Sequence, residues 1–174
     1  MSQHESKKRD FQLKPLSRDG VEAALNKAEH YRLLNQPKLA ESICLDILEI
    51  DHTNQKASVV LLLALTDQFG QSTPTVAKQA QEMANALMDE YARQYYTGII
   101  HERQGNVALN SSVHGSDYDA YEWYLEAMEY FEKAGALAPP SNNDAILRWN
   151  TCARTIMQFK LEERPSDAPH PILE

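Results

Sequence analysis

Apolar residues recur at intervals of three and four along most of the chain, and short polar segments interrupt them. This interval places apolar side chains on one face of an α-helix. Turn-forming residues, among them proline, asparagine and glycine, separate the consecutive apolar stretches. We therefore expect seven helices, at residues 21–34, 37–50, 55–69, 75–88, 91–105, 117–137 and 144–160.

The clearest packing pattern surrounds residue 131. Ala127, Phe131 and Ala134 are spaced i, i+4 and i+7, so they share one helical face. The two alanines allow a neighbouring helix to approach closely, and Pro139 forbids further helix. Gly98, in the preceding predicted helix, has no side chain and favours the same close approach. We expect the segments around Gly98 and Ala127 to lie side by side, with Phe131 buried.

This spacing of small residue, aromatic, small residue and proline resembles the second half of a tetratricopeptide repeat, whose period is about 34 residues. Related spacings occur at Ala40 and Cys44 and at Ala80 and Ala84. The resemblance implies an all-α fold, a right-handed superhelix of about three helical hairpins plus a C-terminal capping helix. The repeats would occupy residues 20–53, 54–91 and 92–140, and the capping helix residues 143–160.

The chain departs from the repeat pattern in two places. His52 stands where the first repeat would have proline, and the interval from Gly98 to Ala127 exceeds the repeat spacing by about 17 residues. The excess includes the polar segment 110–116, so we expect an insertion there. Gly105 and Asn106 are interpreted as the end of the fifth helix.

Repeat proteins of this family commonly bind peptides or proteins in a groove lined by the first helix of each hairpin. The resemblance implies a partner-binding surface formed by Leu25, Glu29, Arg32, Val59, Leu63, Thr66, Asp67, Tyr95, Ile99, Glu102 and Arg103. One subclass holds a terminal carboxylate with Lys, Asn and Arg, but this chain has Leu25 and Glu29 where Lys and Asn would be needed. An acidic, partly apolar groove would repel a carboxylate, so an apolar or basic segment is the expected ligand.

Charge and composition argue against two classes of partner, nucleic acids and membranes. The net charge of −8 argues against nucleic acid, because affinity for phosphates comes chiefly from Lys and Arg. The longest apolar run, residues 59–65, is too short to cross a bilayer, so no membrane partner is expected. No secretory segment is visible, which favours the cytoplasm. Cys44 and Cys152 lie within helical apolar patterns and are predicted to be buried thiols.

The two ends of the chain differ from its centre. Residues 1–18 are charged and polar, and we interpret them as a flexible leader. Residues 162–174 contain three prolines and are expected to form an extended, weakly ordered tail. The helical domain is therefore expected at residues 19–161.

The polar segment near His114 contains the residue types of a hydrolytic triad, with serines 111, 112 and 116 and Asp117 nearby. A triad needs a rigid scaffold and an oxyanion site, and one short loop provides neither. No spacing of His, Asp or Glu matches a known metal motif. We expect no enzyme activity, cofactor or metal.

The sixth predicted helix carries aromatic residues on more than one face: Tyr118, Tyr121, Trp123, Tyr124 and Tyr130. A single neighbouring helix cannot bury all of them. Either the insertion folds back over them or they form an exposed recognition patch. In the last helix, Trp149 is either a core anchor or a ligand contact, and Arg148 and Arg154 could meet an acidic group.

These features favour a non-catalytic interaction module that holds a partner protein or peptide in a helical-repeat groove. The alternative is a structural, self-associating role, in which the aromatic helix or the terminal helix packs against a second copy. Neither the partner's identity nor the biological process can be derived from the residue pattern.

Overall fold

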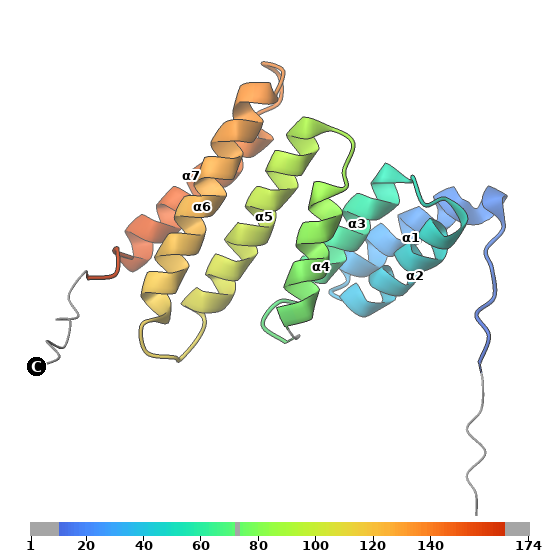
Figure 1. The fold of residues 1–174 in the computed structure, drawn as a ribbon, viewed down its shortest axis with the longest axis horizontal. Helices are drawn as coiled ribbons and strands as arrows, with labels where there is room; N and C mark the ends of the chain where they lie inside the picture. The colour runs from blue at the N-terminus through green and yellow to red at the C-terminus, as the bar shows by residue number, and fades with distance from the viewer. Residues whose placement is uncertain (1–10, 72–73, 166–174) are drawn as a thin grey trace, which may run out of the picture.

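A computed structural model describes residues 11–71 and 74–165 of the chain (Figure 1). Within these ranges it contains one short 3-10 turn and seven α-helices, and no strand. The predicted all-α fold class is confirmed. The elements are η1 (Arg18–Gly20), α1 (Val21–Leu33), α2 (Pro37–Ile50), α3 (Gln55–Thr66), α4 (Pro74–Asn85), α5 (Glu90–Leu109), α6 (Ser116–Leu137) and α7 (Asp144–Phe159).

The helices form a row in which each packs against the next along the chain (Figure 1). Helix α1 also contacts α3, and α3 contacts α5, so these alternate helices are neighbours as well. Helices α1 to α3 lie at one end of the row and α6 and α7 at the other, with α4 and α5 between them. None of the helices in the described residues is both long enough and apolar enough to span a membrane.

Local capping explains where several helices begin. Asn54 accepts a hydrogen bond from the Ala57 backbone N–H (3.0 Å) at the start of α3. Asp89 accepts one from Ala92 (2.8 Å) at the start of α5. Such caps satisfy N–H groups that have no partner within the helix. Pro37 lies in the first turn of α2, as predicted, because its missing N–H costs nothing there.

The predicted end of the fifth helix was wrong. Helix α5 continues through Gly105 to Leu109. Gly105 is buried, and a Cβ added to it would lie 2.9 Å from the ring of Tyr124 on α6. The missing side chain therefore makes room for an aromatic ring instead of ending the helix. Figure 1 shows α5 and α6 lying side by side as long antiparallel helices.

The extra residues of the third hairpin mainly lengthen its two helices. Helix α5 has 20 residues and α6 has 22, and only residues 110–115 form the loop between them. Of the two alternatives for the aromatic residues, a long insertion that folds back over them is not observed between α5 and α6. Instead, Tyr124 is buried between helices, and Trp123 and Tyr130 pack on either side of His101 from α5.

The packing pattern around Phe131 is confirmed. Phe131 is 1% exposed, and a Cβ added to Gly98 would lie 2.6 Å from its ring. Gly98 and Gly105 are seven residues apart, and so are their partners Phe131 and Tyr124. The two glycines thus form matching hollows on α5 that receive two rings from α6. The hydroxyl of Tyr124 donates a 2.7 Å hydrogen bond to Asn106, which satisfies its polar end.

The buried apolar residues form two clusters. The first involves α1 to α4 together with Ile100 of α5, and the second involves α5 to α7 and Leu161. Leu63 of α3 and Tyr96 of α5 contact both clusters. The row of helices therefore has two centres of apolar packing that are joined through α3 and α5.

The two cysteines lie one in each cluster. Cys44 and Cys152 are fully buried free thiols, as predicted. Burial raises the pKa of each to about 12, because a thiolate is poorly solvated inside the protein. Both side chains therefore behave as small apolar residues.

Candidate functional site

The residues predicted to bind a partner come from α1, α3 and α5, together with Asp67 directly after α3, and the ion pairs of Asp67 bring Arg32 and Arg103 onto one surface. We call this surface the α1/α3/α5 face. Of the other predicted residues, Glu29 is exposed, and the half-buried side chains are Arg32, Val59, Leu63, Asp67, Tyr95 and Arg103.

Four of the predicted binding residues lie below this surface. Ile99 and Thr66 are 2% and 3% exposed, and Glu102 and Leu25 are 5% and 8% exposed. The Thr66 hydroxyl donates to the Leu63 backbone carbonyl at 2.8 Å. The repeat pattern gives the helix on which a residue lies, but an error of one residue rotates the expected side-chain direction by about 100°, which is enough to move it from the surface into the core. These four residues support the face from beneath.

Asp67, the C-cap residue of α3, forms ion pairs with side chains of α1 and α5. The Arg32 Nε lies 2.8 Å from one of its carboxylate oxygens, and the Arg103 Nη2 lies 3.7 Å from the other. The three side chains are 17 to 35% exposed, so solvent weakens the attraction. The two ion pairs nevertheless show that side chains of α1 and α5 meet at the end of α3.

Glu102 of α5 is buried and pairs with α7. Arg148 Nη1 donates to both of its carboxylate oxygens, at 3.1 and 3.3 Å. Burial raises the pKa of Glu102, and the charges of Arg148 and Arg103 oppose this rise. Arg148 therefore meets an acidic group of its own chain, whereas the expectation for Arg148 and Arg154 concerned a ligand. Glu102 is therefore not a free acid that a partner could contact.

Tyr95 is part of an aromatic group on α5. Its ring stacks on Tyr91 at 5.6 Å and meets the edge of Tyr96 at 5.2 Å. It also contacts Phe131 of the second cluster at 5.9 Å. The predicted binding residues include Tyr95 but not Tyr91. The i, i+4 spacing of the two tyrosines could have indicated that they share a face.

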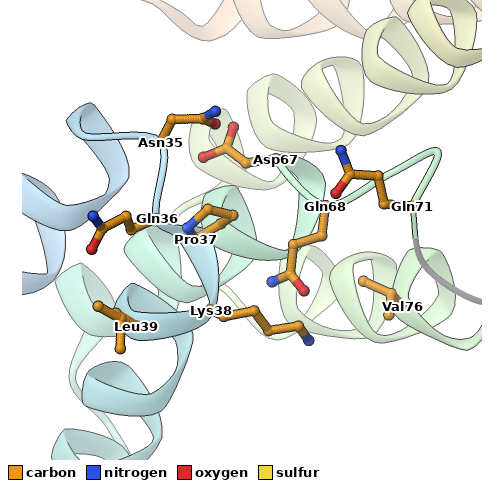
Figure 2. Close-up of a pocket in the computed structure, with 9 residues that line it drawn as sticks. All are labelled: Asn35, Gln36, Pro37, Lys38, Leu39, Asp67, Gln68, Gln71 and Val76. Atoms are coloured by element: carbon orange, nitrogen blue, oxygen red, sulfur yellow. The ribbon is translucent and has the colours of Figure 1, made fainter.

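Two open hollows lie on either side of Asp67. The larger is about 720 Å³, and Figure 2 shows that side chains from the α1–α2 turn, the start of α2, the segment after α3 and the start of α4 surround it. The smaller, about 510 Å³, is bordered by Thr66, Gly70 and Arg103. Turn residues form much of both hollows, so helical periodicity could not predict them.

Gln68 lines the larger hollow and is 5% exposed. Its amide N–H groups donate to Glu41 (2.7 Å) and to the Ala64 carbonyl (3.0 Å). Its amide oxygen has no hydrogen-bond partner among the described residues. The segment after α3 therefore contributes polar groups to the hollow, as the α1–α2 turn does.

The loop near His114 contains no assembled catalytic group. The Ser116 hydroxyl donates to the Ser111 carbonyl at 3.2 Å, and the Ser111 hydroxyl accepts from the Val113 N–H at 3.2 Å. His114 is exposed. In residues 11–71 and 74–165, no group of three or more His, Cys, Asp or Glu side chains is placed to hold a metal ion.

Comparison with protein-family models, curated proteins and solved structures finds no match to this chain. The candidate site is therefore defined by its own geometry: the α1/α3/α5 face, its charge pairs at Asp67 and Glu102, and the two hollows beside Asp67.

Proposed function

We propose that this chain is a non-catalytic protein-interaction module that binds a peptide or protein segment across the α1/α3/α5 face. The observation that carries the proposal is the meeting of α1, α3 and α5 at Asp67, where Arg32 and Arg103 hold side chains of separate hairpins on one surface. Rigid elements that present a continuous surface are suited to binding an extended segment with little ordering cost.

The proposal includes a tetratricopeptide-like architecture of about three helical hairpins in a right-handed superhelix. Two features support it. Phe131 packs over Gly98 as the repeat spacing implies, and alternate helices α1, α3 and α5 are in contact. In such an array the first helices of the hairpins form the groove.

The side chains of the face favour a ligand that is partly apolar and carries a basic group. Val59, Leu63 and Tyr95 are half-buried and offer apolar and aromatic contacts. Asp67 and Glu102 are already neutralised by arginines of the same chain, whereas Glu29 is exposed at the α1 edge. A Lys or Arg of the ligand would therefore lie near Glu29, with an apolar residue over Leu63 and Tyr95.

A peptide-display selection against the full chain tests this proposal. The selected peptide is synthesised, and its affinity is measured by fluorescence polarisation for the wild type, Glu29→Lys and Val59→Gln. We expect each variant to weaken binding by roughly tenfold or more, which corresponds to about 1.4 kcal/mol.

The matched control is Glu49→Lys, which makes the same charge change at an exposed position on α2. It should bind as the wild type does. Equal affinities for all four proteins, or a selection that yields no binding peptide, would refute the α1/α3/α5 face as the binding surface. Circular dichroism of each variant shows whether the fold is retained.

A further inference from the structure

The leader, residues 1–18, differs in charge from the rest of the chain. It contains five Lys or Arg and two Asp or Glu, whereas the remaining residues contain twelve and twenty-three. A basic run at residues 7–9 is followed by two apolar residues, Phe11 and Leu13. The leader thus combines the basic and apolar character that the α1/α3/α5 face favours in a ligand.

The described part of the leader exposes its apolar side chains. Phe11 and Leu13 are 79% and 89% exposed, and in the described residues neither belongs to the two apolar clusters. Leu16, in contrast, packs against the first cluster and so holds the leader beside α1. Figure 1 shows the leader leaving the row of helices at this end. The two side chains therefore do not cover the face of their own chain, and they are available to another molecule.

The receiving surface has acidic side chains that are not yet paired. Glu22 and Glu29 are exposed and, being seven residues apart, lie on the same side of α1. Within residues 11–71 and 74–165, neither takes part in an ion pair. A Lys or Arg that adjacent apolar contacts hold beside them gains electrostatic attraction without breaking an existing pair.

The spacing of charge and apolar surface on the face matches the leader. Helices α1 and α3 run in the same direction (Figure 1), and the pair between Arg32 and Asp67 sets their register. One turn before that pair on each helix, Glu29 lies level with Leu63. Packed helices are about 8–10 Å apart, and three residues of an extended chain cover about 10 Å. The middle of the basic run lies three residues before Phe11, so it reaches Glu29 when Phe11 lies over Leu63.

We propose that the leader of a second copy of this chain binds the α1/α3/α5 face, with Phe11 over Leu63 and the basic run beside Glu29. This inference rests on the proposed function and names its ligand. Alternate side chains of an extended segment point to the same side, so Leu13 follows Phe11 onto the face toward Tyr95. Each copy carries both a leader and a face, so two copies can exchange leaders reciprocally.

Sedimentation velocity of the full chain over a range of concentrations tests the proposal. We expect the wild type to self-associate as its concentration rises. Phe11→Ser and Glu29→Lys should each raise the apparent dissociation constant by roughly tenfold or more, because each damages one side of the contact.

Two matched controls make the same residue changes elsewhere. Phe159→Ser removes a phenylalanine that is 53% exposed at the end of α7, and Glu49→Lys reverses an exposed charge on α2. Both should associate as the wild type does. A wild type that stays monomeric at every concentration would overturn the proposal, and so would equal association by the variants and their controls.

Mixing the two variants shows whether the leader contacts the face between copies. Phe11→Ser keeps an intact face, and Glu29→Lys keeps an intact leader. An equimolar mixture should therefore associate more tightly than either variant alone, because one native contact per pair remains. A mixture that associates no more tightly than its components would refute the leader–face contact.

A labelled synthetic peptide of residues 6–16 separates the remaining possibilities. Fluorescence polarisation should show that it binds the full chain and that the same peptide with Phe11→Ser binds roughly tenfold more weakly. Binding of the leader to its own face would instead leave the wild type monomeric and make the peptide bind more tightly to the Phe11→Ser protein. If display-selected peptides bind the face while the wild type stays monomeric, the proposed function stands and this assignment of its ligand is wrong.

Discussion

His101 on α5 is enclosed by groups from α6. Its imidazole lies between the rings of Trp123 (5.3 Å) and Tyr130 (5.0 Å), and its Nδ1 is 2.7 Å from a carboxylate oxygen of Glu126. Lys133 lies over the Tyr130 ring at 4.7 Å. Burial lowers the pKa of His101, and Glu126 opposes this effect without cancelling it.

This environment predicts a pH dependence of stability. A lowered pKa means that the folded state binds a proton less readily than the unfolded state. His101 therefore contributes stability above the usual histidine pKa of about 6.5, and this contribution is lost as the pH falls below that value. We expect the free energy of unfolding of the wild type, relative to His101→Gln, to decrease between pH 7 and pH 5.

Urea unfolding at several pH values measures this difference. His114→Gln provides the matched control for removal of an imidazole, because His114 is exposed in the loop before α6. A difference between the wild type and His101→Gln that stays constant with pH would contradict the prediction.

At the scale of helices, the α5–α6 pair depends on glycines that receive aromatic rings. Both rings are buried and close to α5, so neither can move away easily. Gly135 provides an informative contrast, since it lies in α6 with open space around it. The same residue type thus serves close packing at one position and only lowers helix propensity at the other.

Gly98→Ala should destabilise the protein, and Gly135→Ala should stabilise it. A methyl group at Gly98 would lie 2.6 Å from the Phe131 ring, and such overpacking costs about 1–3 kcal/mol. At Gly135 the better helix propensity of alanine should add about 0.5–1 kcal/mol. Thermal and urea denaturation measure both values, and changes of the same sign in the two variants would be inconsistent with this account.

The sequence predicted helices well and their lateral packing less well. Periodic apolar residues placed all seven helices, and the Ala127, Phe131 and Ala134 spacing gave the contact with Gly98. Gly105 was misinterpreted because a glycine that ends a helix and a glycine that receives a ring look the same in one sequence. By residue type Ser72 and Thr73 are the candidate N-caps of α4, and both lie outside the described residues.

The candidate site could be predicted only in part, because one sequence does not show how a residue packs against other helices. Periodicity assigned residues to the face but did not separate surface positions from Ile99 and Glu102, which lie one turn apart and are buried. The partner of Glu102 comes from α7, which is 46 residues away in sequence. Long-range pairs of this kind depend on the tertiary arrangement and leave no local signal.

At the scale of the whole molecule, two apolar clusters share one chain. Leu63 and Tyr96 contact both of them, so these side chains couple the halves that α1 to α4 and α5 to α7 form. In repeat-like proteins, cooperativity depends on such contacts between neighbouring units. Both tryptophans, Trp123 and Trp149, lie in the second half.

Leu63→Ala should therefore reduce cooperativity as well as stability. Because Leu63 is half-buried, we expect a loss of about 1–3 kcal/mol, below the range for a fully buried leucine. Tryptophan fluorescence reports on α6 and α7, and far-UV circular dichroism reports on all helices. The two urea transitions should coincide in the wild type and separate in the variant. Coincident transitions in Leu63→Ala would argue against a coupling role.

The burial of both native thiols makes the protein convenient for site-specific labelling. Maleimide dyes attack thiolates, and neither Cys44 nor Cys152 supplies one readily to solvent. A cysteine introduced at the exposed position Glu49 on α2, outside the α1/α3/α5 face, would thus take up a fluorophore selectively while the native sequence is otherwise kept. Energy transfer from such a dye to a labelled peptide would report occupancy and bound orientation in a single titration.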